Sequence, residues 1–237
     1  MLHLSLISPL NMGVLMSDKK TVLFLGKKDD WHTERALRFL RMHFDVTEYL
    51  GDWAHRKPWD LYAMSWEYDY IISYLSRWVV PAEILKKTRE ANINFHPASP
   101  AYPGIGCVNF ALFDETVIYG CTCHHMEPEV DTGKIIAIRL IIVHPNDTVE
   151  SLLNRTYDEQ LSLFHWVCDA IIRTGRIPES KHPWRRKPYT RKEFDELGII
   201  KPGMNTTEVR RRVRAVTYKQ WGPRIEIDGV LFRLEGV

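Results

Sequence analysis

Thr21-Val22-Leu23-Phe24-Leu25-Gly26 is a short run of apolar residues that ends in glycine. Such a run is typical of a strand that is buried on both faces of a parallel sheet. The next segment, Trp31–His43, carries its apolar residues at helical spacing, and Asp45–Leu50 reads as a second strand. The order strand, helix, strand indicates one βαβ unit at the start of the fold.

The alternation continues beyond this unit. Asp69–Tyr74 is a third apolar run, Pro81–Leu85 reads as a helix with proline in its first turn, and Asn92–His96 reads as a fourth strand. Strands that alternate with helices predict an α/β protein with a doubly wound, mostly parallel sheet. Ligands of such sheets bind beyond the carboxyl ends of the strands, where Asn94 and His96 would lie.

The pattern changes after residue 116. Val117–Met126 and Lys134–Val143 read as two extended segments that flank the loop Glu127–Gly133. The capping box at Asp147–Glu150 then predicts the start of a long helix that reaches about Arg173. Asp131 lies in the loop between the two extended segments.

The last segment reads as a small unit of its own. Pro178–Pro188 is polar and proline-rich, which favours a linker. Asn205–Glu208 is a second capping box before the helix Val209–Val216, and Asp228-Gly229 marks the turn of a hairpin. We therefore expect an N-terminal extension at 1–20, a catalytic domain at 21–178 and a small C-terminal subdomain of helix plus hairpin at 179–237.

Composition narrows the class of protein. Of the 237 residues, 45% are hydrophobic and 26% are charged, as in an ordinary globular protein. Residues 1–16 are apolar but lack a basic start and are too short to span a bilayer, so we expect a cytoplasmic protein. Cys121 and Cys123 stand beside His124 and His125, but no second pair at zinc spacing follows, so we expect no metal site.

Charge is distributed unevenly. Residues 181–237 hold 14 Lys and Arg against 7 Asp and Glu, whereas residues 1–180 hold 18 against 23. A basic tail suggests an anionic partner such as a phosphate or RNA, and a solvated basic helix is an equal alternative. Arg210–Arg214 is the segment that would contact RNA phosphates.

Several common catalytic motifs are absent. The segment after the first strand, Gly26-Lys27-Lys28-Asp29-Asp30, is neither a G-x-G-x-x-G nor a P-loop, and no G-x-S-x-G occurs. A nicotinamide dehydrogenase, an NTPase and an α/β-hydrolase are therefore disfavoured.

Asn94, His96 and Asp131 offer a set of groups for acyl transfer to an amine. An Asn and a His two apart on a strand point to the same side. The Asn amide can donate to an oxyanion, the His can take a proton, and the Asp can orient and charge the imidazole. Spacing alone favours a plainer interpretation, in which Asn94 and His96 make strand-end hydrogen bonds and Asp131-Thr132-Gly133 is a turn.

Residues 70–164 resemble the formyltransferases that use N10-formyltetrahydrofolate. The resemblance lies in Ile71–Tyr74, Pro81–Leu85, Asn94–Gly104, Gly120–Met126 and Asp131–Ile135, in the same order, followed by the helix start at Asp147-Thr148. It implies that Asn94, His96 and Asp131 are catalytic and that N10-formyltetrahydrofolate is the formyl donor. Ala98-Ser99-Pro100 is one residue shorter than the family pattern, so this loop departs from it.

The family acts on several amines. The tail of this chain resembles that of the enzymes that act on nucleotide-linked amino sugars, in residues 213–216, Trp221-Gly222 and the hairpin. The specific substrate that we expect is dTDP-4-amino-4,6-dideoxyglucose, used in the synthesis of surface polysaccharide or O-antigen. Phosphoribosylglycinamide and methionyl-tRNA formyltransferases are alternatives, and formyltetrahydrofolate hydrolase or an RNA-binding protein is a further one. The expected partners are folate and the nucleotide sugar, with a homodimer, no membrane and no nucleic acid.

The resemblance also implies where ligands bind. We expect the donor to be bound by Tyr74, Leu75, Arg77, Trp78, Met126, Glu127 and Val130. We expect the acceptor to be bound by Ser73, Arg77, Tyr102, Pro103, Gly104, Ile105 and Tyr189. Further candidates for the diphosphate are Arg185, Arg186, Lys187 and Arg191, with Tyr189 or Trp184 stacked on the base, and a solvated basic loop is the alternative.

Overall fold

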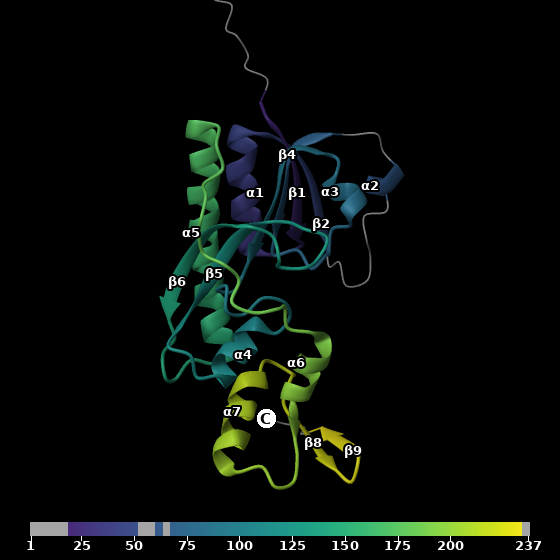
Figure 1. Ribbon diagram of the computed structural model, residues 1–237, viewed down its shortest axis with the longest axis vertical. Helices are drawn as coiled ribbons and strands as arrows, with labels where there is room; N and C mark the ends of the chain where they lie inside the picture. The colour runs from purple at the N-terminus through teal and green to yellow at the C-terminus, as the bar shows by residue number, and fades with distance from the viewer. Residues whose placement is uncertain (1–18, 52–59, 64–66, 234–237) are drawn as a thin grey trace, which may run out of the picture.

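The computed structural model describes residues 19–51, 60–63 and 67–233 (Figure 1). Most of the predicted N-terminal extension lies outside these residues. The larger part of the fold contains β1 (Thr21–Lys27), α1 (Trp31–His43), β2 (Asp45–Gly51), α2 (Asp60–Ala63), β3 (Tyr68–Tyr74), α3 (Ala82–Leu85), β4 (Thr88–His96), α4 (Cys107–Phe113), β5 (Ile118–His125), β6 (Ile135–Ile142) and α5 (Val149–Thr174).

The central sheet has six strands in the order β2-β1-β3-β4-β5-β6. Strands β2, β1, β3 and β4 are parallel, while β5 runs antiparallel to β4 and β6 antiparallel to β5. The strand order reverses at β1 and β3, as in doubly wound folds. This confirms the predicted α/β class and the mostly parallel sheet.

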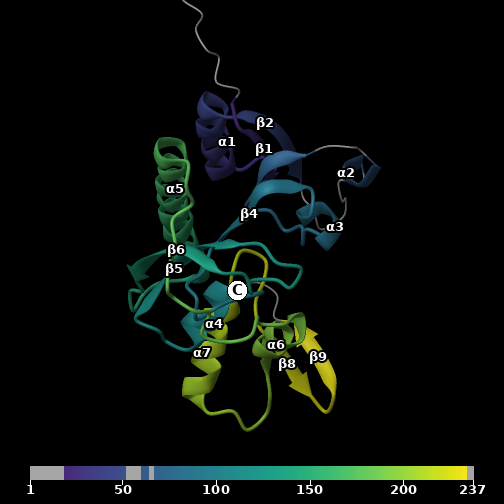
Figure 2. The ribbon, with the colours of Figure 1, turned by 45° about the horizontal axis from the view of Figure 1, so that its top comes forward.

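Helices cover both faces of the sheet (Figures 1 and 2). Helices α1 and α5 lie on one face, where Leu40 and Phe164 pack against Phe24 and Phe95 in a buried cluster. Helix α3 lies on the other face with Ile71, and this second layer is thinner. Strand residues alternate between the two layers, so the side chains beside a core residue such as Phe95 point to the opposite face.

The C-terminal residues form a separate small unit below the sheet in Figure 1. It contains α6 (Arg191–Leu197), β7 (Ile199–Ile200), α7 (Thr206–Val216), β8 (Arg224–Ile227) and β9 (Val230–Arg233), with the strands in the order β7-β8-β9. Helix α7 packs against α4 through the buried Ala215 and Val216. Helix α4 lies in the connection from β4 to β5, so the unit is attached at the end of the sheet where β4 ends and β5 begins.

Local details differ from the sequence predictions. The cap of α5 is Thr148, which forms the capping box with Ser151, whereas Asp147 accepts hydrogen bonds from the His144 backbone and Ser151 and pairs with Arg155. The predicted box is thus displaced by one residue, because two neighbouring polar side chains could each cap the helix. Helices α2, α4 and α6 were not predicted, since each has only 4 or 7 residues and too few turns for a periodic signal.

No helix in the part of the chain that the structure describes is long and apolar enough to cross a membrane.

Candidate active site

Asn94 and His96 lie at the carboxyl end of β4, on the face of the sheet opposite to α1 and α5. Their neighbour Phe95 belongs to the core cluster on the α5 side, so alternation turns Asn94 and His96 away from it. Asn94 stands opposite Ser73 on β3 and opposite His124 on β5. Ser73, Asn94 and His124 therefore form a row across three adjacent strands.

Asp131 reaches this row from the loop between β5 and β6. Its backbone has a φ of 50°, a left-handed conformation that is uncommon for Asp and rarer still for bulkier residues. One carboxylate oxygen lies 3.4 Å from Nδ1 of His96, and the other lies 3.3 Å from Nε2 of His124. The backbone N–H of Gly104 donates to Asp131 at 2.7 Å. The structure thus brings together the predicted trio and adds a second imidazole.

In the sequence, His124 stands out only as a neighbour of Cys121 and Cys123, at a metal site that is not expected. It is buried, and its Nδ1 lies 2.7 Å from the carbonyl oxygen of His125. A carbonyl only accepts, so Nδ1 carries a proton. Nε2 faces both the Asn94 amide nitrogen, at 3.0 Å, and the Asp131 carboxylate, at 3.3 Å. His124 therefore contacts both the Asn94 amide and the Asp131 carboxylate.

The Asp131 carboxylate determines the protonation of His96. Burial lowers the pKa of the His96 imidazole, but the Asp131 charge, with contacts to Cys107 and the Tyr102 carbonyl, outweighs burial and raises this pKa to about 9. Burial raises the pKa of Asp131, and the two neighbouring imidazoles and the Gly104 N–H bring it down to about 2. Nε2 of His96 lies 3.1 Å from the Tyr102 carbonyl oxygen, so both ring nitrogens face acceptors. At neutral pH His96 is an imidazolium paired with a carboxylate.

Gly133 allows the Asp131 loop to pack closely against β5. A Cβ at this position would lie 1.9 Å from the carbonyl oxygen of His125. Replacing Gly133 by Ala should therefore displace the loop and the Asp131 carboxylate, lower stability by about 1–3 kcal/mol and reduce activity. Thermal unfolding and turnover would test this, with Gly222→Ala as the control, because a Cβ there meets nothing within 4 Å. Equal behaviour of the two variants would contradict the packing argument.

The predicted acceptor residues lie around the loop after β4. Tyr102 is buried and contributes its carbonyl to His96, and the parallel bridge between Gly104 and Tyr189 joins this loop to the segment before α6. Tyr189 is stacked on Phe110 at 3.6 Å, and the Arg186 guanidinium lies 3.1 Å over its ring. Both contacts cannot share one face, so both faces of Tyr189 are covered. In this arrangement neither face of Tyr189 is open to a nucleotide base, and its role in binding the acceptor stays a prediction.

The remaining acceptor residues follow the same loop. Pro103 accepts a hydrogen bond from the Tyr189 N–H, and the Ile105 N–H donates to the Tyr189 carbonyl. Ser73 is buried beside Asn94, as the register requires. The loop after β4 is therefore held in place by backbone hydrogen bonds to the segment before α6.

The predicted donor residues fall into three groups. Tyr74 is fully buried and packs on Phe95 and Phe164, so its side chain faces the core and only its backbone is available to a ligand. Trp78 and Met126 belong to one apolar cluster on the face that carries Asn94. Four further predicted residues are more accessible: Leu75 is half-buried, and Arg77, Glu127 and Val130 are exposed.

The predicted basic linker lies against the site. Arg186 pairs with Glu193 at 2.9 Å, which neutralises it as a phosphate ligand, whereas Arg185, Lys187 and Arg191 are exposed. Trp184 is half-buried, and its indole N–H donates a hydrogen bond to the Gly133 carbonyl at 2.8 Å. No local sequence pattern indicates this contact, because it joins positions 51 residues apart.

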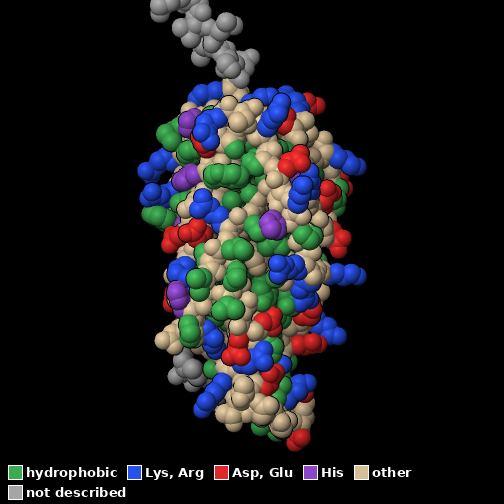
Figure 3. Space-filling model, turned by 60° about the vertical axis from the view of Figure 1, so that its left-hand side comes forward, with side chains coloured by type: hydrophobic (Ala, Val, Ile, Leu, Met, Phe, Trp, Pro, Cys, Tyr) green, Lys and Arg blue, Asp and Glu red, His purple; other side chains and the backbone are tan. Residues whose placement is uncertain are grey.

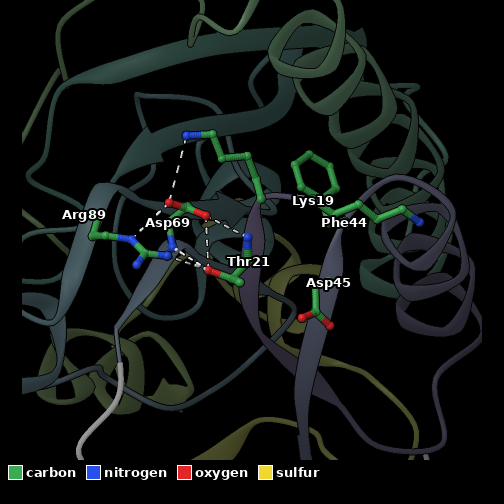
Figure 4. A pocket seen from close by; sticks show the side chains of 7 residues that line it. Lys19, Thr21, Phe44, Asp45, Asp69 and Arg89 are labelled. Carbon is green, nitrogen blue, oxygen red and sulfur yellow. Dashed lines mark hydrogen bonds and ion pairs between the residues drawn. The ribbon is translucent and has the colours of Figure 1, made fainter. Parts of the chain in front are cut away.

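A separate hollow lies at the other end of the sheet, where β1, β3 and β4 begin (Figure 4). It is lined by Lys19, Thr21, Asp69 and Arg89 among others. Asp69 accepts hydrogen bonds from the Thr21 backbone and from Arg89, so the polar groups there bind one another. This hollow contributes nothing to the trio.

Comparison with known proteins agrees with the geometry. Residues 56–167 match the family model described as formyl transferase. A GDP-perosamine N-formyltransferase from Brucella melitensis is 25% identical over 171 residues, which cover 71% of this chain and 65% of that protein. The chain thus spans slightly less than two thirds of the length of this relative.

Two solved structures share the fold. A 4-N formyltransferase from Francisella tularensis aligns with a TM-score of 0.71 at 16% identity, over 92% of this chain and 99% of that one. An N-formyltransferase from Helicobacter canadensis, in complex with folinic acid and dTDP-3-aminofucose, aligns with a TM-score of 0.69 at 17% identity, over 88% and 84%. Residues 56–167 thus match the formyl transferase domain model, and the two solved formyltransferases share the fold of the chain.

Proposed function

We propose that the protein transfers a formyl group from N10-formyltetrahydrofolate to the amine of a nucleotide-linked amino sugar. The observation that carries this proposal is the buried pairing of Asp131 with His96 beside the Asn94 amide, at the carboxyl end of β4. The Brucella relative is a GDP-perosamine N-formyltransferase, and the Helicobacter structure contains folinic acid and dTDP-3-aminofucose, which supports the same pair of substrates here.

The donor substrate fits the face of the sheet that carries Asn94. Met126 is half-buried against the cluster that contains the buried Trp78, and it offers an apolar surface for the flat pterin ring. The backbone of Tyr74 and Leu75 offers polar groups at the end of β3. Ligand sites commonly combine such an apolar lining with a few placed polar groups. We propose that these residues, with Arg77, Glu127 and Val130, bind the folate.

The transfer joins the amine nitrogen to the formyl carbon, breaks the bond from that carbon to the folate nitrogen, and moves one proton from the amine to the folate nitrogen. Asn94, in contact with His124, presents an N–H to the oxygen that becomes negative. The His96 imidazolium stabilises the same charge and can give a proton to the departing nitrogen. This differs from the sequence expectation that His96 first removes a proton, because the Asp131 pair keeps its pKa high.

We propose that the acceptor is a nucleotide sugar, and dTDP-4-amino-4,6-dideoxyglucose is the specific candidate. We propose that the formylated sugar is used in surface polysaccharide or O-antigen synthesis. Tyr102, Pro103, Gly104 and Ile105 border the trio, and the exposed Arg77 is the candidate ligand of the diphosphate. The relatives differ in nucleotide, GDP in one and dTDP in the other. The choice of nucleotide thus has to be measured.

The RNA-binding alternative is weakened by the contacts of helix α7. Arg211 donates to the Phe113 carbonyl, Arg212 to the Leu197 carbonyl and Arg214 to the Asp147 carbonyl. Only Arg210 of this run is exposed. On the face that Figure 3 shows, basic and acidic side chains are interspersed. These arginines attach the C-terminal unit to the core instead of forming a phosphate-binding surface.

The test is incubation with N10-formyltetrahydrofolate and one acceptor at a time: amino-sugar nucleotides, glycinamide ribonucleotide, methionyl-tRNA and water alone. A gain of one formyl group by an amino-sugar nucleotide, detected by mass spectrometry, supports the proposal. Formylation of only another acceptor, or formate released equally without any acceptor, would assign the chain to one of the alternative activities.

We also propose that the protein is a cytoplasmic homodimer. The four cysteines are free and three of them are buried, as in proteins of a reducing compartment. In the C-terminal sheet β9 is an edge strand, and Val230, Leu231 and Phe232 are each about half exposed or more. An apolar edge strand is a template for pairing with a second chain.

Replacing Phe232 by Glu should convert the dimer to a monomer, because the charge would be buried in the paired sheets. The molar mass in solution, measured by light scattering after gel filtration, would show this. Met42→Glu on α1 is the control, since Met42 is 59% exposed and lies on a different element. A monomeric parent, or a variant with the parent's mass, would contradict this interface.

A further inference from the structure

Trp184 lies over the trio although it comes from the segment between α5 and α6. Its ring makes edge contacts with two imidazoles, at 5.1 Å between ring centroids for His124 and 6.0 Å for His96. Its indole N–H donates to the carbonyl of Gly133, two residues after Asp131. One side chain therefore contacts both histidines and the loop that carries their carboxylate.

The backbone around Trp184 is also fixed to the site. The N–H of Arg185 donates to the Pro100 carbonyl at 2.9 Å, and the N–H of Tyr189 donates to the Pro103 carbonyl at 2.8 Å. The 183–189 segment thus joins the loop after β4 to the loop before β6. The backbone anchor at Arg185 directly follows Trp184 and, with the indole hydrogen bond to Gly133, keeps the Trp184 side chain in one position.

We propose that Trp184 is a positioning residue, which holds His96, His124 and the Asp131 loop in the arrangement required for formyl transfer. The effect on catalysis rests on the proposed function, whereas the contacts of Trp184 rest on geometry alone. Trp184 reaches the reaction through the imidazoles and the Gly133 carbonyl, so it acts on the rate of the chemical step more than on substrate binding. The C-terminal unit begins directly after this segment and is thereby linked to the active site.

The first test compares Trp184→Ala with Trp184→Phe. The Ala variant loses the ring and the hydrogen bond, and its kcat should fall about 10–100-fold with KM changed less than about threefold, since small misplacements of catalytic groups are costly. The Phe variant retains the ring contacts with the imidazoles and should lose less than about tenfold. Trp221→Phe is the control, because Trp221 is 60% exposed and its ring contacts Arg233.

The second test needs no activity. A protonated imidazole quenches the fluorescence of an adjacent indole, so the emission of Trp184, taken as the parent minus Trp184→Phe, should increase as the pH rises through the pKa of His96 near 9. This titration should disappear in a His96→Asn background. The difference between the parent and Trp221→Phe should not follow the same curve.

Three results would overturn the proposal: an unchanged kcat in Trp184→Ala, a loss confined to KM, or a Trp184 emission that does not depend on His96. If the Ala variant does not fold, the Phe variant and the titration decide the question. If the parent transfers no formyl group to any acceptor, the proposed function fails, while the titration still tests whether Trp184 reports on the imidazolium.

Discussion

Replacement of His96 by Asn is expected to reduce formyl transfer about 10³–10⁴-fold while the protein stays folded. The His96 imidazolium contacts the Asp131 carboxylate and lies two residues after Asn94 on β4. Asn is neutral at every pH, so it cannot stabilise the developing negative charge as a cation or supply a proton. Steady-state turnover with the preferred amino-sugar nucleotide would measure the loss.

The control for this variant is His43→Asn, the same substitution at an exposed position at the end of α1. We expect this control to retain the parent's kcat and thermal stability. Near-normal turnover of His96→Asn, with its fold verified by circular dichroism, would remove His96 from the mechanism. It would leave Asn94 and the bound substrates as the remaining source of catalysis.

Replacement of Asp131 by Asn is expected to change both the rate and its dependence on pH. In the parent the pKa of His96 is raised to about 9, so His96 is protonated at neutral pH and activity should decline only as the pH rises through that value. Without the carboxylate, burial dominates and the pKa of His96 should fall below its usual 6.5. At pH 7.5 the ring would then be neutral, and kcat should fall about 10³–10⁴-fold.

The pH profile separates this effect from a general loss of structure. We expect the alkaline limb of kcat to move from near 9 in the parent to below 6.5 in Asp131→Asn, with partial recovery of activity in acid. Thr132→Ser, an exposed neighbour, is the control and should keep the parent's profile. If Asp131→Asn lost activity with an unchanged limb, Asp131 would not determine the charge of His96.

The sequence predicted the parts of the molecule that depend on local patterns. The apolar runs of β1 and β3 and the alternation at β4 fixed the sheet, because each strand carries its own burial signal. Asn94 and His96 could be placed on one side of a strand end for the same reason. Asp131 joined them only through the resemblance, since no local rule says which loop contacts which strand.

What could not be predicted depends on register and on long-range contacts. His124 faces Asn94 because β5 pairs antiparallel with β4 at that register, and the sequence does not state the register. Trp184 appeared to be a linker residue, because proline-rich polar segments often are exposed, yet its indole is bonded to Gly133. The sequence predicts that Tyr189 can stack on a nucleotide base, and no local pattern predicts that Phe110 and Arg186 cover its two faces.

The central claim is that Asn94, His96 and Asp131 move a formyl group from folate to a sugar amine. The most direct measurement follows tetrahydrofolate release while the acceptor is identified by mass spectrometry, for the parent and for His96→Asn. We predict release that requires an amino-sugar nucleotide and that matches, mole for mole, an acceptor carrying one added formyl group. Release that is independent of the acceptor, or formylation that persists unchanged in His96→Asn, would contradict the claim.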